Sequence, residues 1–149
     1  MPMYEQFATN SDFERQGVEV DYGEFRVRLA RAGGANKRFA RVLEHKSRPF
    51  RRAIQADTMD RDKADAILRE TYAEAVVLNW EVRIEDTQTG DERWVQGIEN
   101  PEGGDPLPFN RDNVLRTLEA LPDLFQELQE QASRISLYRE QLLEDEAGN

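Results

Sequence analysis

The chain has 149 residues, enough for one domain with a buried core and too few for a second of ordinary size. It is 38% hydrophobic and 34% charged, with a net charge of −10. No apolar run approaches the roughly 20 residues that span a bilayer, and the first residues lack the basic and apolar blocks of a signal peptide, so we expect a cytoplasmic protein. The lack of cysteine excludes disulfides, thiolate metal sites and cysteine nucleophiles, and the single histidine, His45, excludes multi-histidine metal clusters.

The charge is divided unevenly along the chain. Residues 1–56 contain eleven Lys and Arg against seven Asp and Glu, a balance of +4. Residues 57–149 contain nine against twenty-three, a balance of −14, and the two sum to −10. Such asymmetry is typical of a chain whose two faces attract different partners, or of a basic patch neutralised by the rest of the protein.

The first thirty residues predict an arm followed by a hairpin. Residues 1–15 show no sustained hydrophobic period, so we expect a flexible or partner-dependent arm. From Val18 to Leu29 the apolar residues alternate, and their parity changes across Gly23. This pattern predicts two strands joined by a turn near Tyr22-Gly23.

Helical spacing follows the hairpin. Gly33-Gly34 breaks the strand, and residues 36–46 place Phe39, Val42 and Leu43 on one helical face that we expect in the core. Pro49 ends this helix or opens a short one. Asp60 can cap a further helix, whose apolar or small residues fall at helical spacing for about four turns: Ala64, Ile67, Leu68, Thr71, Tyr72, Ala75 and Val76.

The rest of the chain predicts short strands and two helices. Alternation from Trp80 to Ile84, a TQTG turn and Trp94-Val95 indicate short extended segments or a second hairpin, and residues 100–108 form a loop. Asn110 or Asp112 can cap the next helix, and Pro122 begins the last. This last helix has an apolar stripe that packs against the core or receives a partner helix, and core packing is the stronger prediction; the stripe consists of Phe125, Leu128, Ala132, Ile135, Tyr138 and Leu142.

These patterns together predict an α+β fold that is predominantly helical. An N-terminal β-hairpin is followed by a small helical bundle, with room for a second short hairpin. We expect a flexible arm at residues 1–16, a single domain at 17–143 and a frayed tail at 144–149.

The segment from Arg28 to Arg52 is the most unusual, because it contains nine Lys and Arg and one acidic residue. Its Gly33-Gly34 lies between a predicted strand and a predicted helix, where phosphate loops occur, yet neither G-x-x-x-x-G-K-[ST] nor G-x-G-x-x-G fits. Nucleic-acid binding is a weaker prediction than protein contact, because the net charge of −14 on residues 57–149 repels a polyanion.

No catalytic or metal motif emerges elsewhere. The carboxylates of residues 57–65 lack the EF-hand glycine and glutamate, so they favour a helix N-terminus. Thirty carboxylates make some close pairs inevitable, and His45 near a helix end is a solvated or capping residue. Trp80 and Trp94 are most simply core or edge aromatics, since the segment between them is acidic. We therefore expect a protein without enzymatic activity and without a cofactor.

The succession of short phrases over residues 17–149 resembles the tail assembly chaperones of long-tailed bacteriophages. The strongest phrases are LARAGGANKRFARVLE and, within PFNRDNVLRTLEALPDLFQELQEQAS, the run from Asn113 through Phe125, in which Leu121-Pro122-Asp123 joins two helices. YAEAVVLNWE and the terminal LYREQLLEDEAGN add to the likeness. Asn110 and Asp112 depart from an expected T-x-E-N pattern, but both retain helix-capping ability.

The resemblance implies a protein of the host cell cytoplasm that binds the tape measure protein and tail tube subunits during tail assembly and is missing from the finished virion. In many such phages a programmed frameshift also yields a longer product. The alternatives are a structural tail or neck subunit retained in the particle, and a nucleic-acid-associated regulator. Candidate partner-binding residues, in a chain that also has the charge for homo-oligomer formation, are Arg38, Arg41, Arg51, Arg52, Phe125, Leu128, Ile135, Tyr138 and Leu142.

Overall fold

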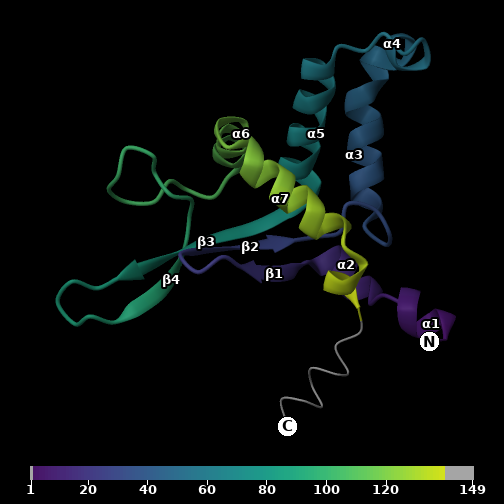
Figure 1. Cartoon of the computed structure of the whole chain (residues 1–149). Helices are drawn as coiled ribbons and strands as arrows, with labels where there is room; N and C mark the ends of the chain where they lie inside the picture. Colours follow the sequence, from purple (N-terminus) through teal and green to yellow (C-terminus); the bar gives the residue numbers. More distant parts are fainter. Residues whose placement is uncertain (1, 140–149) are drawn as a thin grey trace.

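The computed structural model describes residues 2–139 as one antiparallel sheet with helices gathered on one of its faces (Figure 1). The strands are β1 (Val18–Asp21), β2 (Phe25–Leu29), β3 (Val77–Glu85) and β4 (Glu92–Gln96). The helices are α1 (Met3–Phe7), α2 (Ser11–Gln16), α3 (Lys37–Ser47), α4 (Arg51–Gln55), α5 (Arg61–Ala75), α6 (Arg111–Ala120) and α7 (Pro122–Ser133), with 3₁₀ turns η1 (Arg48–Phe50) and η2 (Ile135–Tyr138). The predicted helix-rich α+β class is confirmed.

Both predicted hairpins are present, and they share one sheet in the order β1-β2-β3-β4. In the first hairpin the Gly23 amide donates a hydrogen bond to Asp21 Oδ1 at 2.7 Å, and Gly23 has a φ of 91° that few other residues adopt. The sequence did not predict that β2 would pair with β3, because residues 30–76 separate the two strands. This pairing converts two local hairpins into a single surface on which the helices pack.

The core lies between the sheet and the helices α5, α6 and α7. Alternation along the strands places Val27, Leu29 and Trp80 on the helix side, each at most 3% exposed. Burying these side chains removes apolar surface from water, which is the main favourable contribution to folding. The core cluster consists of Val27, Leu29, Tyr72, Ala73, Val76, Val77, Trp80, Ile98, Val114, Leu118, Phe125, Leu128 and Ala132.

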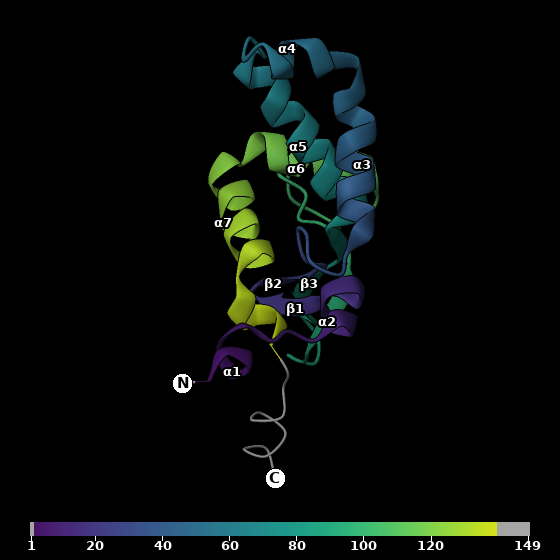
Figure 2. The same cartoon turned by 90° about the vertical axis from the view of Figure 1, so that its right-hand side faces the viewer.

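The segment α3–α4–α5 projects from the sheet as a helical pair with α4 at its tip (Figures 1 and 2). Asp60 caps α5, as predicted, by accepting from the Asp62 amide at 3.1 Å. The helix α3 has no fully buried residue. We predicted Phe39, Val42 and Leu43 in the core, but each of them is only partly buried. Phe39 packs edge-to-face on Tyr72 with ring centroids 5.9 Å apart, which joins α3 to the core.

The C-terminal helix differs from its prediction. Asn110 caps α6 by accepting from the Asn113 amide at 2.9 Å, and Pro122 begins α7, both as expected. The predicted stripe to Leu142 is nevertheless not one helix, because α7 ends at Ser133 and Arg134 is extended. The 3₁₀ turn η2 follows, while Leu142 and the tail predicted at 144–149 lie outside the described residues.

The N-terminal segment, for which we expect a flexible or partner-dependent arm, contains two short helices. Asn10 caps α2 through its side chain, and its backbone N–H donates to the Tyr138 carbonyl at 2.7 Å. Glu14, only 4% exposed, forms an ion pair with Arg31 just after β2. These contacts fasten α2 to the domain, whereas α1 lies at the periphery (Figure 2).

Candidate partner-binding surfaces

The four arginines predicted to bind a partner all lie on the projecting helices. Arg38 and Arg41 are exposed on α3, and Arg51 and Arg52 are exposed on α4. Arg51 lies 3.4 Å from Glu44, whereas the other three have no ion-pair partner among residues 2–139. Their charge is therefore available to a ligand, although the structure does not test whether one binds.

Glu44 partly neutralises the distal end of α3. The Arg48 guanidinium donates to Glu44 at 2.8 Å, and this hydrogen bond is the main reason why the pKa of the Glu44 carboxyl lies below its ordinary value. A shallow hollow of about 220 Å³ beside this pair is lined by Glu44, Arg48, Arg51 and Ile54, among others. The distal end thus carries mixed charge around one exposed apolar side chain.

The proximal end of α3 is different, because it borders a hollow lined only by basic, amide and apolar residues. This hollow, which we call the α3 pocket, has a volume of about 510 Å³. Four cationic side chains line it, contributed by α2 and α3. The complete lining is Arg15, Ala35, Asn36, Lys37, Arg38, Arg41, Ala75 and Leu78.

Three of the candidate apolar residues are part of the protein's own core. Phe125, Leu128 and Tyr138 are 7%, 0% and 0% exposed, so they are not available to a partner in this fold. Phe125 packs edge-to-face on Tyr72, with the two ring centroids 5.3 Å apart. Their burial agrees with core packing, the stronger of the two alternatives for this stripe, while a partner-binding role stays a prediction. Ile135 is half-buried in η2.

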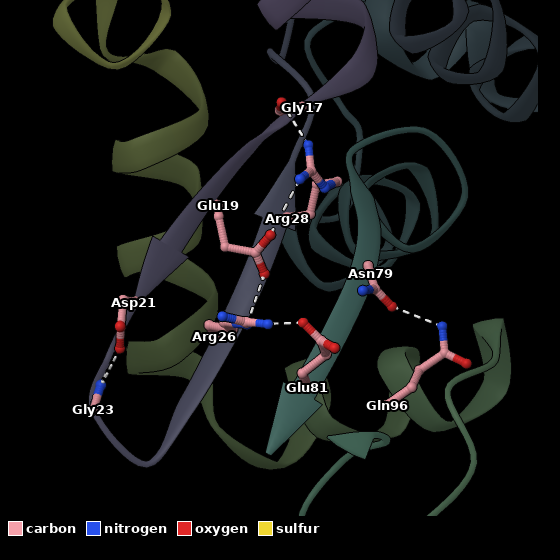
Figure 3. A network of polar contacts seen from close by, with 9 residues as sticks. All are labelled: Gly17, Glu19, Asp21, Gly23, Arg26, Arg28, Asn79, Glu81 and Gln96. Atoms are coloured by element: carbon pink, nitrogen blue, oxygen red, sulfur yellow. Dashed lines mark hydrogen bonds and ion pairs between the residues drawn. The ribbon is translucent and has the colours of Figure 1, made fainter. Parts of the chain in front are cut away.

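The sheet face opposite the helices carries a network of charged side chains (Figure 3). Arg26 lies between two carboxylates, with its Nε 2.8 Å from Glu81 Oε1 and 3.3 Å from Glu19 Oε1. Arg28 pairs with Glu19 at 3.2 Å and donates to the Gly17 carbonyl at 3.0 Å (Figure 3). The charges on this face are paired within the chain, which leaves little net attraction for an outside ligand.

Trp94 completes this face. The Arg26 guanidinium lies 4.3 Å and the Arg83 guanidinium 5.7 Å from its ring centroid, both within the range of cation–π attraction. The ring is thus engaged by two arginines of the chain itself, an arrangement that does not favour base stacking. The alternation of charged and apolar residues along the strands is the sequence signal that could have predicted this face.

The sequence did not predict an exposed apolar cluster on α1. Met3, Tyr4 and Phe7 are 65%, 77% and 62% exposed, and they are three of the five most exposed large hydrophobic residues within the part of the chain that the structure describes. The other two, Ile54 and Leu121, lie apart on α4 and after α6. We call these three side chains the α1 cluster.

The titratable groups with the largest shifts are structural. Burial raises the pKa of Tyr72 to about 12 and raises those of Tyr22 and Tyr138 further. Tyr22 donates to Glu127 at 2.7 Å, and Tyr138 donates to the Leu29 carbonyl at 3.0 Å. Each of these hydroxyls therefore stays protonated at neutral pH and supports packing.

Residues 2–139 hold neither a metal-ion cluster nor a membrane-spanning helix. In this range no group of three or more His, Cys, Asp or Glu side chains is arranged to hold a metal ion. Within the same range, no helix combines the length and apolar character of a membrane span. The lack of enzymatic activity stays a prediction.

Comparison with known proteins identifies the origin of the chain. A family model described as YdaY prophage protein matches residues 34–149, which is most of the chain. The chain belongs to this family and is therefore of phage origin. No curated protein and no solved structure matches it. The phage part of the predicted resemblance is confirmed, while the role in tail assembly stays a prediction.

Proposed function

We propose that the protein is a tail assembly chaperone that binds the tape measure protein and tail tube subunits without catalysing a reaction. The observation that carries this proposal is the α1 cluster, because a chaperone needs an apolar surface that is available before its client binds. Large apolar side chains grouped on a surface are typical of interaction sites. Membership in a prophage family supports the biological setting.

The basic helices α3 and α4 support the same proposal. Arg38, Arg41 and Arg52 have no ion-pair partner within residues 2–139, so no carboxylate of this range competes with an acidic client for them. Charge of this kind accelerates encounter and orients a partner, while apolar contact supplies most of the affinity. An apolar contact at α1 and charge at α3 and α4 would together hold a client reversibly.

Co-expression with the tape measure protein from the same phage tests the proposal. The wild-type chain should keep the tape measure protein soluble and should co-purify with it. The triple variant Met3→Ser/Tyr4→Ser/Phe7→Ser should lose most of the complex, because it removes the α1 cluster. An insoluble tape measure protein beside free wild-type chain would refute the proposal.

The control removes the remaining exposed apolar residues. Ile54→Ser/Leu121→Ser replaces side chains that are 48% and 51% exposed but lie away from α1, so its complex should form normally. Equal loss of complex in both variants would assign the effect to general surface hydrophobicity and would argue against a client site at α1. Circular dichroism of the free variants checks that each is folded.

Mass spectrometry of purified phage particles separates the chaperone from a structural subunit. A chaperone should be present in infected cells and missing from particles. A fixed number of copies in each particle would favour the alternative of a tail or neck subunit. A gel shift at low salt would instead support the nucleic-acid-associated alternative, since phosphate contacts weaken as salt rises.

A further inference from the structure

The α3 pocket concentrates positive charge at a place where the fold itself disfavours it. Lys37, Arg38 and Arg41 occupy the first half of α3, whose first turn contains no acidic residue. The N-terminus of a helix carries a partial positive charge, so cations there are electrostatically unfavourable. A local conflict of this kind within an otherwise consistent sequence is typical of a functional position.

The chain supplies no counter-ion for these three side chains within residues 2–139. The fourth cation, Arg15, pairs with Asp12 on the exposed side of α2, so the region keeps a net positive charge. Asn36 does not cap α3 through its side chain, because its amide donates to the carbonyls of Arg31 and Ala75 at 2.8 and 2.9 Å. Asn36 therefore anchors the start of α3 beside the pocket, and the cationic side chains of the pocket are left accessible to an anion.

The pocket is not lined by cations alone. Ala35, Ala75 and Leu78 add apolar surface between the charged side chains. A ligand that matches this lining has carboxylates for the cations and aliphatic carbon for the apolar part. A short acidic peptide segment that also contains leucine has both properties, whereas inorganic phosphate has only the first.

Such a segment follows directly after the described residues. Residues 140–149 read EQLLEDEAGN and contain four acidic residues, two leucines and no basic residue. We propose that the α3 pocket binds an acidic polypeptide segment, and that residues 140–149 of the same chain occupy it in the free protein. The proposal goes beyond the role in tail assembly and does not depend on it.

The position of η2 makes this contact sterically attainable. The Tyr138 carbonyl accepts from the Asn10 amide at 2.7 Å, so η2 lies against the start of α2. Arg15, which lines the pocket, lies five residues further along α2, or about 7.5 Å at 1.5 Å per residue. Ten residues of extended chain span up to about 33 Å, which exceeds this separation several-fold. Both views show α2 next to the proximal end of α3 (Figures 1 and 2).

Zero-length carbodiimide cross-linking of the full chain tests the contact, because it joins a lysine amine only to a carboxylate in direct contact. The three lysines of the chain are Lys37 in the pocket, Lys46 on α3 and Lys63 on α5. Lys46 lies 2.9 Å from Glu74, so their link is an internal positive control. We expect peptide mass spectrometry to find Lys37 joined to an acidic residue of 140–149.

A mixture of ¹⁴N- and ¹⁵N-labelled protein shows whether the link lies within one chain. Links between Lys37 and residues 140–149 that contain one isotope only would support the proposal. Mixed-isotope links would assign the segment to a second copy and overturn it. A Lys46–Glu74 link without any link from Lys37 to residues 140–149 would overturn it as well. So would links from Lys63 to residues 140–149 that are as abundant as those from Lys37.

Charge variants of the full chain complete the test. Arg38→Gln/Arg41→Gln should lower the yield of the Lys37 link about fivefold, on the scale expected for two exposed ion pairs. The matched control Arg93→Gln/Arg116→Gln removes two exposed arginines that have no ion-pair partner among residues 2–139 and do not line the pocket. It should leave the yield unchanged, and an equal loss in both variants would refute a specific site.

Discussion

Replacing Tyr138 by phenylalanine tests how the C-terminal end of the described chain is held on the sheet. The Tyr138 side chain is fully buried, and its hydroxyl donates to the Leu29 carbonyl at the end of β2. Phenylalanine keeps the ring and creates no large cavity, so the change removes little besides this hydrogen bond. A buried acceptor that loses its donor costs roughly 1–3 kcal/mol.

Urea denaturation followed by circular dichroism measures this cost. We expect the free energy of unfolding of Tyr138→Phe to fall by about 1–3 kcal/mol, a sizeable part of the roughly 5–15 kcal/mol typical of a domain. Tyr4→Phe is the matched control, because Tyr4 is 77% exposed, and it should stay within about 0.5 kcal/mol of wild type. A Tyr138→Phe variant as stable as the control would refute the argument.

The pH dependence gives an independent check of the same hydroxyl. Burial raises the pKa of Tyr138 above the value of about 10 that tyrosine has in the unfolded chain. Above pH 10 the unfolded state therefore loses this proton first, and the contribution of Tyr138 to stability falls as the pH rises toward its folded pKa. The difference in unfolding free energy between wild type and Tyr138→Phe should narrow by about 1 kcal/mol between pH 10 and 11. A constant difference would contradict the buried, protonated hydroxyl.

Three further substitutions test separate parts of the fold in the same urea assay. Gly34→Ala should lower the free energy of unfolding by about 1–2 kcal/mol more than Gly90→Ala. Both glycines have positive φ, but only at Gly34 would the new methyl carbon clash with the Glu14 carboxylate. Equal losses of stability in the two variants would contradict this clash. Asn36→Ala should cost roughly 1–3 kcal/mol because it removes one buried hydrogen bond, to the Ala75 carbonyl, and one part-buried hydrogen bond, to the Arg31 carbonyl; an unchanged stability would mean that this amide does not anchor α3. Leu128→Ala should cost about 2–5 kcal/mol, while a stable variant that lost only partner binding would return Leu128 to the interaction surface.

Local chemistry made most of the secondary structure predictable. Asp60 and Asn110 cap α5 and α6 with their own side chains, and Pro122 begins α7, so each boundary depends on residues next to it in the chain. The hairpin at Gly23 is local in the same sense. Signals of this kind do not require knowledge of the tertiary fold.

Tertiary contacts decided the features that the sequence did not predict. The end of α7 at Ser133 follows no glycine or proline, and it allows the Tyr138 hydroxyl to reach Leu29 more than a hundred residues earlier. The docking of α2 depends on the Glu14–Arg31 ion pair, which only the folded chain brings together. Since burial of the α7 stripe depends on such contacts, helical periodicity could not distinguish core from partner surface.

The candidate surfaces were likewise predictable only where they depend on neighbouring residues in the sequence. Arg38 and Arg41 were recognisable from the density of basic residues, but the α3 pocket also needs Arg15 from α2 and Leu78 from β3. These residues lie on three elements that only the fold brings together. The α1 cluster escaped prediction because five residues give too short a period to distinguish an exposed helix from an irregular arm.

The pairing of β2 with β3 has a consequence for how the molecule can vary. Leu29 and Val77 are direct neighbours in the sheet, so the chain leaves and re-enters it at nearly the same point, and α3, α4 and α5 form an excursion between two adjacent strands. Doubling the length of such an excursion raises the entropy cost of closing it by only about 0.6 kcal/mol. Its tip at α4 can therefore gain or lose residues during evolution, or accept an engineered insertion, while the sheet and the core beneath it stay the same.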